Sequence, residues 1–126
     1  MSAQAQPAGT IRKSFSNPDE TRNIPKGKVE VLNLGDVQAM RATFQPGWKW
    51  SECVKPIAGT ESCQVAHLGY QLSGRMRVKM DDGSEHELNA GDACMIPPGH
   101  DAWVIGNEPV IVLDFQGGGI YAKPKS

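Results

Sequence analysis

Short runs in which apolar and polar residues alternate recur along the chain from residue 28 onward. In KVEVLNL (28–34) the two valines fall on one face, and in RMRVKM (75–80) apolar side chains alternate with Arg and Lys. Side chains of a β-strand point to opposite faces in turn, so this alternation is typical of strands with one buried face. Few windows show the 3.6-residue apolar spacing of an amphipathic helix. The pattern therefore predicts an all-β protein with little helix.

Turn-forming residues separate these runs at close intervals. Gly and Pro stand at 46–47, 74, 83, 91, 97–99 and 106, and Asp82-Gly83 is a two-residue hairpin signal. The predicted strands are 28–34, 37–44, 48–56, 64–73, 75–80, 84–88, 93–96, 102–105 and 110–116. Closely spaced turns between alternating strands are typical of a β-sandwich or β-barrel.

Length and composition agree with one β-domain and add a predicted arm and tail at the two ends of the chain. A chain of 126 residues suits one domain with one core. Its 14 Gly and 9 Pro could also belong to a disordered chain, but their placement between strands identifies them as turn residues. We predict a flexible N-terminal arm over 1–22, with one short pairing segment around 11–15, a β-domain over 23–117 and a C-terminal tail over 118–126.

The charge balance is almost neutral, with 13 Lys+Arg against 14 Asp+Glu. This leaves no electrostatic signature of a nucleic-acid or anionic-membrane partner. No apolar run approaches the roughly 20 residues that span a bilayer, and the start MSAQAQPAGT lacks the features of a secretory signal. The odd count of three cysteines fits reduced thiols. We therefore expect a cytoplasmic protein that binds neither nucleic acid nor membrane.

Two groups of glycines and prolines have the spacing of a known pair of motifs. Gly91-Asp92 is followed by Pro97-Pro98-Gly99, and Gly47 and Gly74 stand earlier as an opening and a closing glycine. In this order and spacing they resemble the two motifs of the cupin superfamily, and the resemblance covers roughly 47–116. It implies an antiparallel double-stranded β-helix, which is a jelly-roll barrel. Small cupins are commonly dimers, so the resemblance also implies a homodimer.

The metal ligands of that superfamily are not in their usual places here. Its first motif has His-x-His where this chain has Cys53-Val54-Lys55, and it has Glu where this chain has His67. The second motif has His where this chain has Ala102, with His100 two residues earlier. The resemblance therefore points to Cys53, His67 and His100 as an altered ligand set.

A second alignment remains open for the first motif. Anchored on His67, it puts Glu61 and Cys63 at the His-x-His positions. The first alignment is preferred because Lys55-Pro56 is similar to the His-Pro that often closes this strand. Either Cys53 or Cys63 could thus line the pocket.

Strand alternation groups the polar candidates on shared faces. His67 and Gln71 share a face of their strand, which the family comparison makes the barrel interior, and Cys53 shares a face with Lys55. The expected barrel mouth is lined by Cys53, Lys55, His67, Gln71 and His100, with Asp114 as a further candidate.

The favoured function is a metal-free binding or sensing module for a small polar or anionic ligand. Lys55 and His100 would pair with a carboxylate or phosphate, and Gln71 would orient it. Trp48, Trp50 and Trp103 would form the wall of the mouth, although such residues serve equally as packing or dimer contacts.

Two alternatives involve catalysis. Imidazole and thiolate are suitable ligands for zinc, iron, copper or nickel, so Cys53, His67 and His100 could hold an ion and leave a position for substrate. The ammonium of Lys55 would oppose such a cation. The last alternative is a metal-free isomerase or epimerase with His67 as general base and Lys55 or His100 as its partner.

Overall fold

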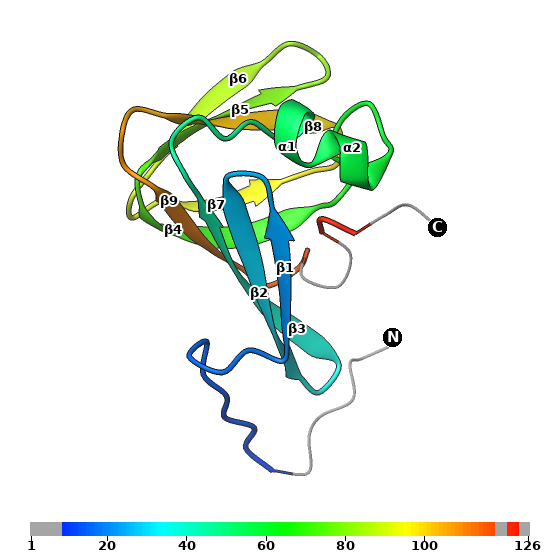
Figure 1. Ribbon diagram of the computed structural model, residues 1–126, viewed down its shortest axis with the longest axis vertical. Helices are drawn as coiled ribbons and strands as arrows, with labels where there is room; N and C mark the ends of the chain where they lie inside the picture. Colours follow the sequence, from blue (N-terminus) through cyan, green and yellow to red (C-terminus); the bar gives the residue numbers. More distant parts are fainter. Residues whose placement is uncertain (1–8, 118–120, 124–126) are drawn as a thin grey trace.

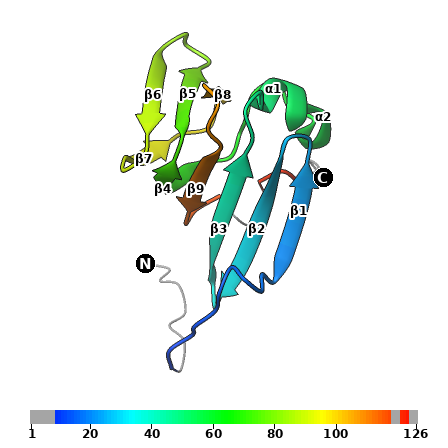
Figure 2. The same cartoon turned by 60° about the vertical axis from the view of Figure 1, so that its left-hand side comes forward.

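The computed structural model of the protein describes residues 9–117 and 121–123, and over this range the chain forms two antiparallel sheets (Figures 1 and 2). The strands are β1 (Glu20–Ile24), β2 (Gly27–Leu34), β3 (Val37–Phe44), β4 (His67–Ser73), β5 (Arg75–Met80), β6 (Glu85–Asn89), β7 (Ala93–Ile96), β8 (His100–Ile105) and β9 (Val110–Asp114). Two helical turns, α1 (Trp50–Cys53) and α2 (Lys55–Ala58), connect β3 to β4. The predicted all-β class is confirmed.

The two sheets combine strands that are far apart in the sequence. The larger has the order β1-β2-β3-β9-β4-β7 and the smaller has the order β6-β5-β8. Because β9 pairs with both β3 and β4, the last strand of the described chain lies in the middle of the larger sheet. In Figure 2, β5, β6 and β8 stand on one side of the molecule, and α1 lies near β8 where β3 ends. This arrangement is the expected jelly-roll barrel.

Apolar side chains from both sheets fill the space between them. Val29 and Ala42 on the larger sheet and Val78 on the smaller one are almost fully buried. Along β8 burial alternates strictly, with His100, Ala102 and Val104 buried and the residues between them half-buried. Burying one such apolar side chain contributes roughly 1.5–3 kcal/mol, so this shared core holds the two sheets together.

The prediction of a strand over 48–56 is wrong. This segment forms α1 and α2, and Trp50, Cys53 and Val54 are its most buried members together with Trp48. Positions 50, 53 and 54 have the spacing of one helical face. Pro56 stands near the start of α2, where the missing N–H of proline costs no hydrogen bond. Two helices of four residues each are too short to show their period in the sequence.

The ends of the β-domain differ in detail from the expected boundaries. β1 begins at Glu20 and pairs along its whole length with β2, so it spans the expected boundary between 22 and 23. Residues 11–15 lie outside the strands. Of the expected tail, 121–123 are described and Tyr121 is buried, whereas 118–120, 124–126 and residues 1–8 of the expected arm lie outside the described residues. No helix within the described ranges is long and apolar enough to cross a membrane.

Candidate metal centre

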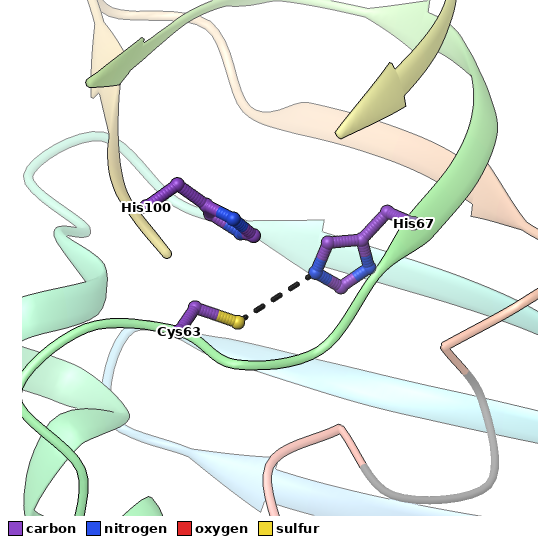
Figure 3. A group of neighbouring side chains, drawn as sticks. All are labelled: Cys63, His67 and His100. Atoms are coloured by element: carbon purple, nitrogen blue, oxygen red, sulfur yellow. Dashed lines mark hydrogen bonds between the residues drawn. The ribbon is translucent and has the colours of Figure 1, made fainter. Parts of the chain in front are cut away.

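Cys63, His67 and His100 come together inside the barrel (Figure 3). One thiol sulfur and one nitrogen of each ring all lie within 4.8 Å of one another. Cys63 Sγ is 3.7 Å from His67 Nε2, and the centroids of the two imidazole rings are 5.3 Å apart. Cys63 and His100 are buried and His67 is half-buried. These three side chains form the candidate metal centre.

Backbone hydrogen bonds bring these three residues together from separate parts of the chain. The Cys63 N–H donates to the carbonyl oxygen of His100 at 2.7 Å, and the Gly99 N–H donates to the carbonyl oxygen of Cys63 at 2.7 Å. His100 is the first residue of β8, and His67 is the first residue of β4. The short connection from Cys63 to His67 therefore crosses from the strand β8 to the strand β4.

Both imidazole rings are oriented by an acceptor at Nδ1. His67 Nδ1 lies 2.5 Å from Asp114 Oδ2, and His100 Nδ1 lies 2.8 Å from the carbonyl oxygen of Pro97. A carbonyl oxygen and an ionised carboxylate can only accept, so each Nδ1 carries a proton, and the neutral form of each ring has its lone pair at Nε2. Metal-binding histidines are typically fixed in this way by a partner behind the ring.

Asp114 is held as a carboxylate despite its burial. Its Oδ1 accepts hydrogen bonds from the backbone N–H groups of Gln116 at 2.9 Å and Gly117 at 3.0 Å. Burial raises the pKa of the Asp114 carboxyl, but the hydrogen bond and charge of His67 and these backbone N–H groups outweigh it and leave the pKa below its ordinary value. Asp114 can therefore serve as the fixed acceptor for His67.

Burial also sets the protonation of the other two members. It lowers the pKa of His100 to about 4 and raises the pKa of the Cys63 thiol to about 11. At neutral pH the metal-free protein thus has an uncharged His100 ring, which is the form of histidine that binds metals. Cys63 is protonated under the same conditions, and an ion would have to displace that proton to gain the thiolate.

A cavity of about 50 Å³ adjoins the candidate metal centre. A cavity needs at least about 10–15 Å³ to hold one water, so this cavity has room for roughly three or four waters or one small ligand. Its wall is mostly apolar and is formed by Met40, Ala42, Phe44, Trp48, Trp50, His67, Gly69, Met76, Leu88, Cys94, Ile96, His100, Ala102, Val112, Asp114 and Tyr121.

The structure brings only some of the predicted site residues to this cavity. His67, His100 and Trp50 line it. Cys53 is buried in the core on α1 and takes no part in the group of possible ligands, where Cys63 stands instead. The alternative alignment thus names the cysteine of the cluster, because Cys53 lies at the end of the helix α1 and not on a strand that faces the cavity.

The other predicted ligand-binding residues lie elsewhere. Lys55 is at the surface and pairs with Glu61 at 3.2 Å. Trp103 is on the outward face of β8, with the ammonium of Lys49 5.2 Å from its ring centroid. Gln71 is buried, and its side-chain amide donates hydrogen bonds to the carbonyl oxygens of Gly74 and Leu88. It is not one of the residues that line the cavity.

Two further residues of the site differ in how far the sequence indicates them. Asp114 shares its strand parity with the buried Val110, which made it a further candidate, but its contact with His67 depends on the pairing of β4 with β9. Tyr121 has no signal, since it lies beyond the last strand. Its ring packs 5.3 Å from that of His67 and lines the cavity.

Comparisons with known proteins agree with this fold. The family model for the cupin domain matches residues 53–116, just over half of the chain. A search of curated proteins finds no match to this sequence.

Solved structures share the architecture at low sequence identity. KdgF from Halomonas sp. is 16% identical, with a TM-score of 0.59 over 87% of this chain and 94% of that one. An RmlC-like cupin from Shewanella frigidimarina is 21% identical, with a TM-score of 0.57 over 85% of this chain and 92% of that one. A variant of Bacillus subtilis oxalate decarboxylase is 18% identical, with a TM-score of 0.61 over 89% of this chain but only 31% of that one. From its fold and its family match, this chain belongs to the cupin domain family.

Proposed function

We propose that the protein binds one transition-metal ion through Cys63, His67 and His100 and uses it to hold a small molecule in the barrel cavity. The observation that carries this proposal is the convergence of the three side chains with both Nδ1 atoms already occupied by acceptors. Two imidazoles and one thiolate are suitable for zinc, iron, copper or nickel. Three protein ligands leave a coordination position for water or substrate, as in catalytic zinc sites.

The chain's own residues would each have a definite part in this site. Asp114 and the Pro97 carbonyl keep the two imidazoles in the tautomer that presents Nε2. The apolar wall limits the water that can reach the ion. A bound ion would supply Lewis-acid activation of an oxygen ligand or a more acidic bound water.

This proposal replaces the cationic pocket that the sequence favoured. An anion site built on Lys55 has no support, because that ammonium pairs with Glu61 at the surface. The described residues that line the cavity include no Lys or Arg, so a metal ion is the source of positive charge that best fits this cavity. The metal-free isomerase has little support, because the position of Lys55 removes one acid–base partner and the lowered pKa of His100 leaves the other neutral.

The decisive experiment is elemental analysis of protein purified without a histidine tag. We expect about one equivalent of a transition metal per chain, and reconstitution of stripped protein with Co²⁺ should give the charge-transfer absorption of a cobalt–thiolate bond. Cys63→Ser, His67→Ala and His100→Ala should each lose the metal. Two variants are matched controls and should retain it: Cys53→Ser in the core and His86→Ala at the exposed surface of β6.

The proposal would be wrong if the wild type neither retains nor takes up metal. It would also be wrong if the three ligand variants, shown to be folded by circular dichroism, held as much metal as the controls.

A further inference from the structure

A second and larger hollow lies where the two sheets are not joined to each other. β7 is an edge strand of the larger sheet and β6 is an edge strand of the smaller one, so no hydrogen-bonded ladder closes the barrel between them in the described part of the chain. Residues of β5, β6 and β7 line a groove of about 430 Å³ there, against about 50 Å³ for the cavity beside the candidate metal centre. Ligand pockets commonly have volumes of roughly 300–1,000 Å³, so the groove alone is large enough to hold a ligand.

The groove lies at the level of the candidate ligand side chains. In the strand pairing, Ile96 of β7 stands opposite His67 of β4, and Met80 of β5 stands opposite His100 of β8. Both Ile96 and Met80 line the groove. The groove therefore lies one strand away from each histidine, on both sheets.

Three residues form a wall that the groove shares with the inner cavity. Leu88, Cys94 and Ile96 line both hollows, and all three are half-buried. His86, which also lines the groove, is exposed, so the groove opens to solvent. A molecule that enters the groove from solvent thus meets the cavity of the candidate metal centre behind these three residues.

The wall of the groove favours an uncharged, apolar molecule. Its members are apolar apart from His86 and Glu87. The Glu87 carboxylate pairs with Arg75 at 3.1 Å and with Arg77 at 3.3 Å, so its charge is already balanced. The described residues that line the groove include no Lys or Arg, so an anionic group would find no permanently cationic side chain there.

We propose, on the basis of the metal function above, that this groove binds the apolar body of the ligand while one end of the ligand reaches the ion through the shared wall. The inner cavity has room for only a few non-hydrogen atoms, whereas the groove can cover an alkyl chain or an aromatic ring. The ligand class is therefore an amphiphilic small molecule with an oxygen, nitrogen or sulfur donor at one end and an uncharged apolar body. Leu88, Cys94 and Ile96 determine specificity, because the donor end has to pass between them.

The test compares two hydroxamates that differ only in the length of the alkyl chain. Acetohydroxamate and octanohydroxamate are titrated by calorimetry into the zinc-loaded, full-length protein, and zinc content is measured on the same samples. Each buried methylene strengthens binding by roughly fourfold, so burial of three or more of the additional methylenes should make octanohydroxamate bind at least about 50-fold more tightly.

A second measurement locates the bound chain in the wild type. Cys94 is a free cysteine that lines the groove, and its alkylation by iodoacetamide can be followed by mass spectrometry. Octanohydroxamate should slow this alkylation, and it should do so more than acetohydroxamate at equal occupancy.

Met80→Gln tests the contact between the groove and the alkyl chain. Met80 lines the groove but not the inner cavity, and glutamine keeps its length while adding a polar group. The variant should lose at least about fivefold in octanohydroxamate affinity and keep its acetohydroxamate affinity and its zinc. Ile11→Gln, at an exposed apolar residue that lines neither hollow, is the matched control and should keep all three values.

Zinc-loaded wild type that binds the two hydroxamates equally, or in which octanohydroxamate does not protect Cys94, would overturn the groove as a ligand site and leave the metal function standing. The same would follow from a folded Met80→Gln variant that keeps the full preference for the longer chain. Wild type that takes up no zinc or other transition metal would overturn both.

Discussion

At the scale of single residues, Asp114 decides whether His67 can act as a ligand. Its carboxylate lies behind the ring and is itself fixed by the backbone N–H groups of Leu68, Gln116 and Gly117. His100 has only the neutral carbonyl of Pro97 in the same place. A charged acceptor makes the opposite ring nitrogen a better donor to a metal, so His67 is the more strongly supported of the two imidazoles.

The substitution Asp114→Asn tests this dependence. It removes the negative charge and keeps the shape, so we expect zinc affinity to fall about 10- to 100-fold while the fold persists. Competition with a chromophoric chelator measures the affinity. Asp82→Asn is a control that removes the same charge from the exposed β5–β6 turn, and it should not change zinc affinity. Equal affinities in the two variants would contradict a positioning role for Asp114.

The buried His100 makes the stability of the metal-free protein depend on pH. Burial lowers its pKa in the folded protein to about 4, against about 6.5 when the chain unfolds. Between these values the unfolded state binds more protons, so acid favours unfolding. The free energy of unfolding should therefore fall as pH drops from 6.5 to 4, by up to about 3 kcal/mol from this group.

Urea unfolding in a chelator at several pH values measures this effect. His100→Gln should be less stable at pH 7, and its stability should change less between pH 6.5 and 4. His86→Gln, on the exposed face of β6, should keep the wild-type profile. A wild-type profile as flat as that of His100→Gln would refute the assignment.

At the scale of elements, the sequence predicts a helix or strand well when the element is long enough to show its period. It does not predict a position that depends on contacts with a distant part of the chain. Burial alternates from residue to residue along β5, β7 and β8, as the sequence predicts, because one face of each strand is turned toward the core. The sequence predicts a strand over 48–56 because two helices of four residues each leave no visible helical period. The predicted strand over 48–56 is also the reason why Cys53 and Lys55 are expected, wrongly, to line the cavity. Cys63 could not be preferred, since its place depends on backbone contacts with His100 that no local pattern encodes.

The pairing of β4 with β9 brings His67 to Asp114, and Gly69 allows this close approach. Gly69 stands opposite Asp114, and a Cβ there would meet the backbone carbonyl oxygen of Leu113. We expect Gly69→Ala to push the strands apart, lower stability by about 1–3 kcal/mol and weaken zinc binding.

Thermal unfolding and zinc titration measure the two consequences of Gly69→Ala. Gly9→Ala is the control, because a Cβ at Gly9 meets nothing within 4 Å. A Gly69→Ala protein with wild-type stability would show that the two strands can separate at no cost.

At the scale of the whole molecule, one outward face exposes a group of large apolar side chains. Leu68, Tyr70 and Leu72 point outward from β4 and are 43–47% exposed, and Met95 on β7 stands opposite Leu68. Phe115 adjoins them, since its N–H donates to the carbonyl oxygen of Leu68. We call these five residues the β4 face. A contiguous exposed apolar patch of this kind marks an interaction site in a folded protein.

We propose that the β4 face pairs with the same face of a second copy, as the sequence resemblance implies for a homodimer. The five residues carry no charge, so a two-fold contact would bring no like charges together. Light scattering should give twice the chain mass of 13.6 kDa for the wild type. Tyr70→Lys with Leu72→Lys should give the single-chain mass with unchanged zinc content, because these side chains point away from the cavity. Ile11→Lys, a control at another exposed apolar residue, should stay dimeric. A monomeric wild type, or a double variant that stays dimeric, would remove the β4 face as the interface.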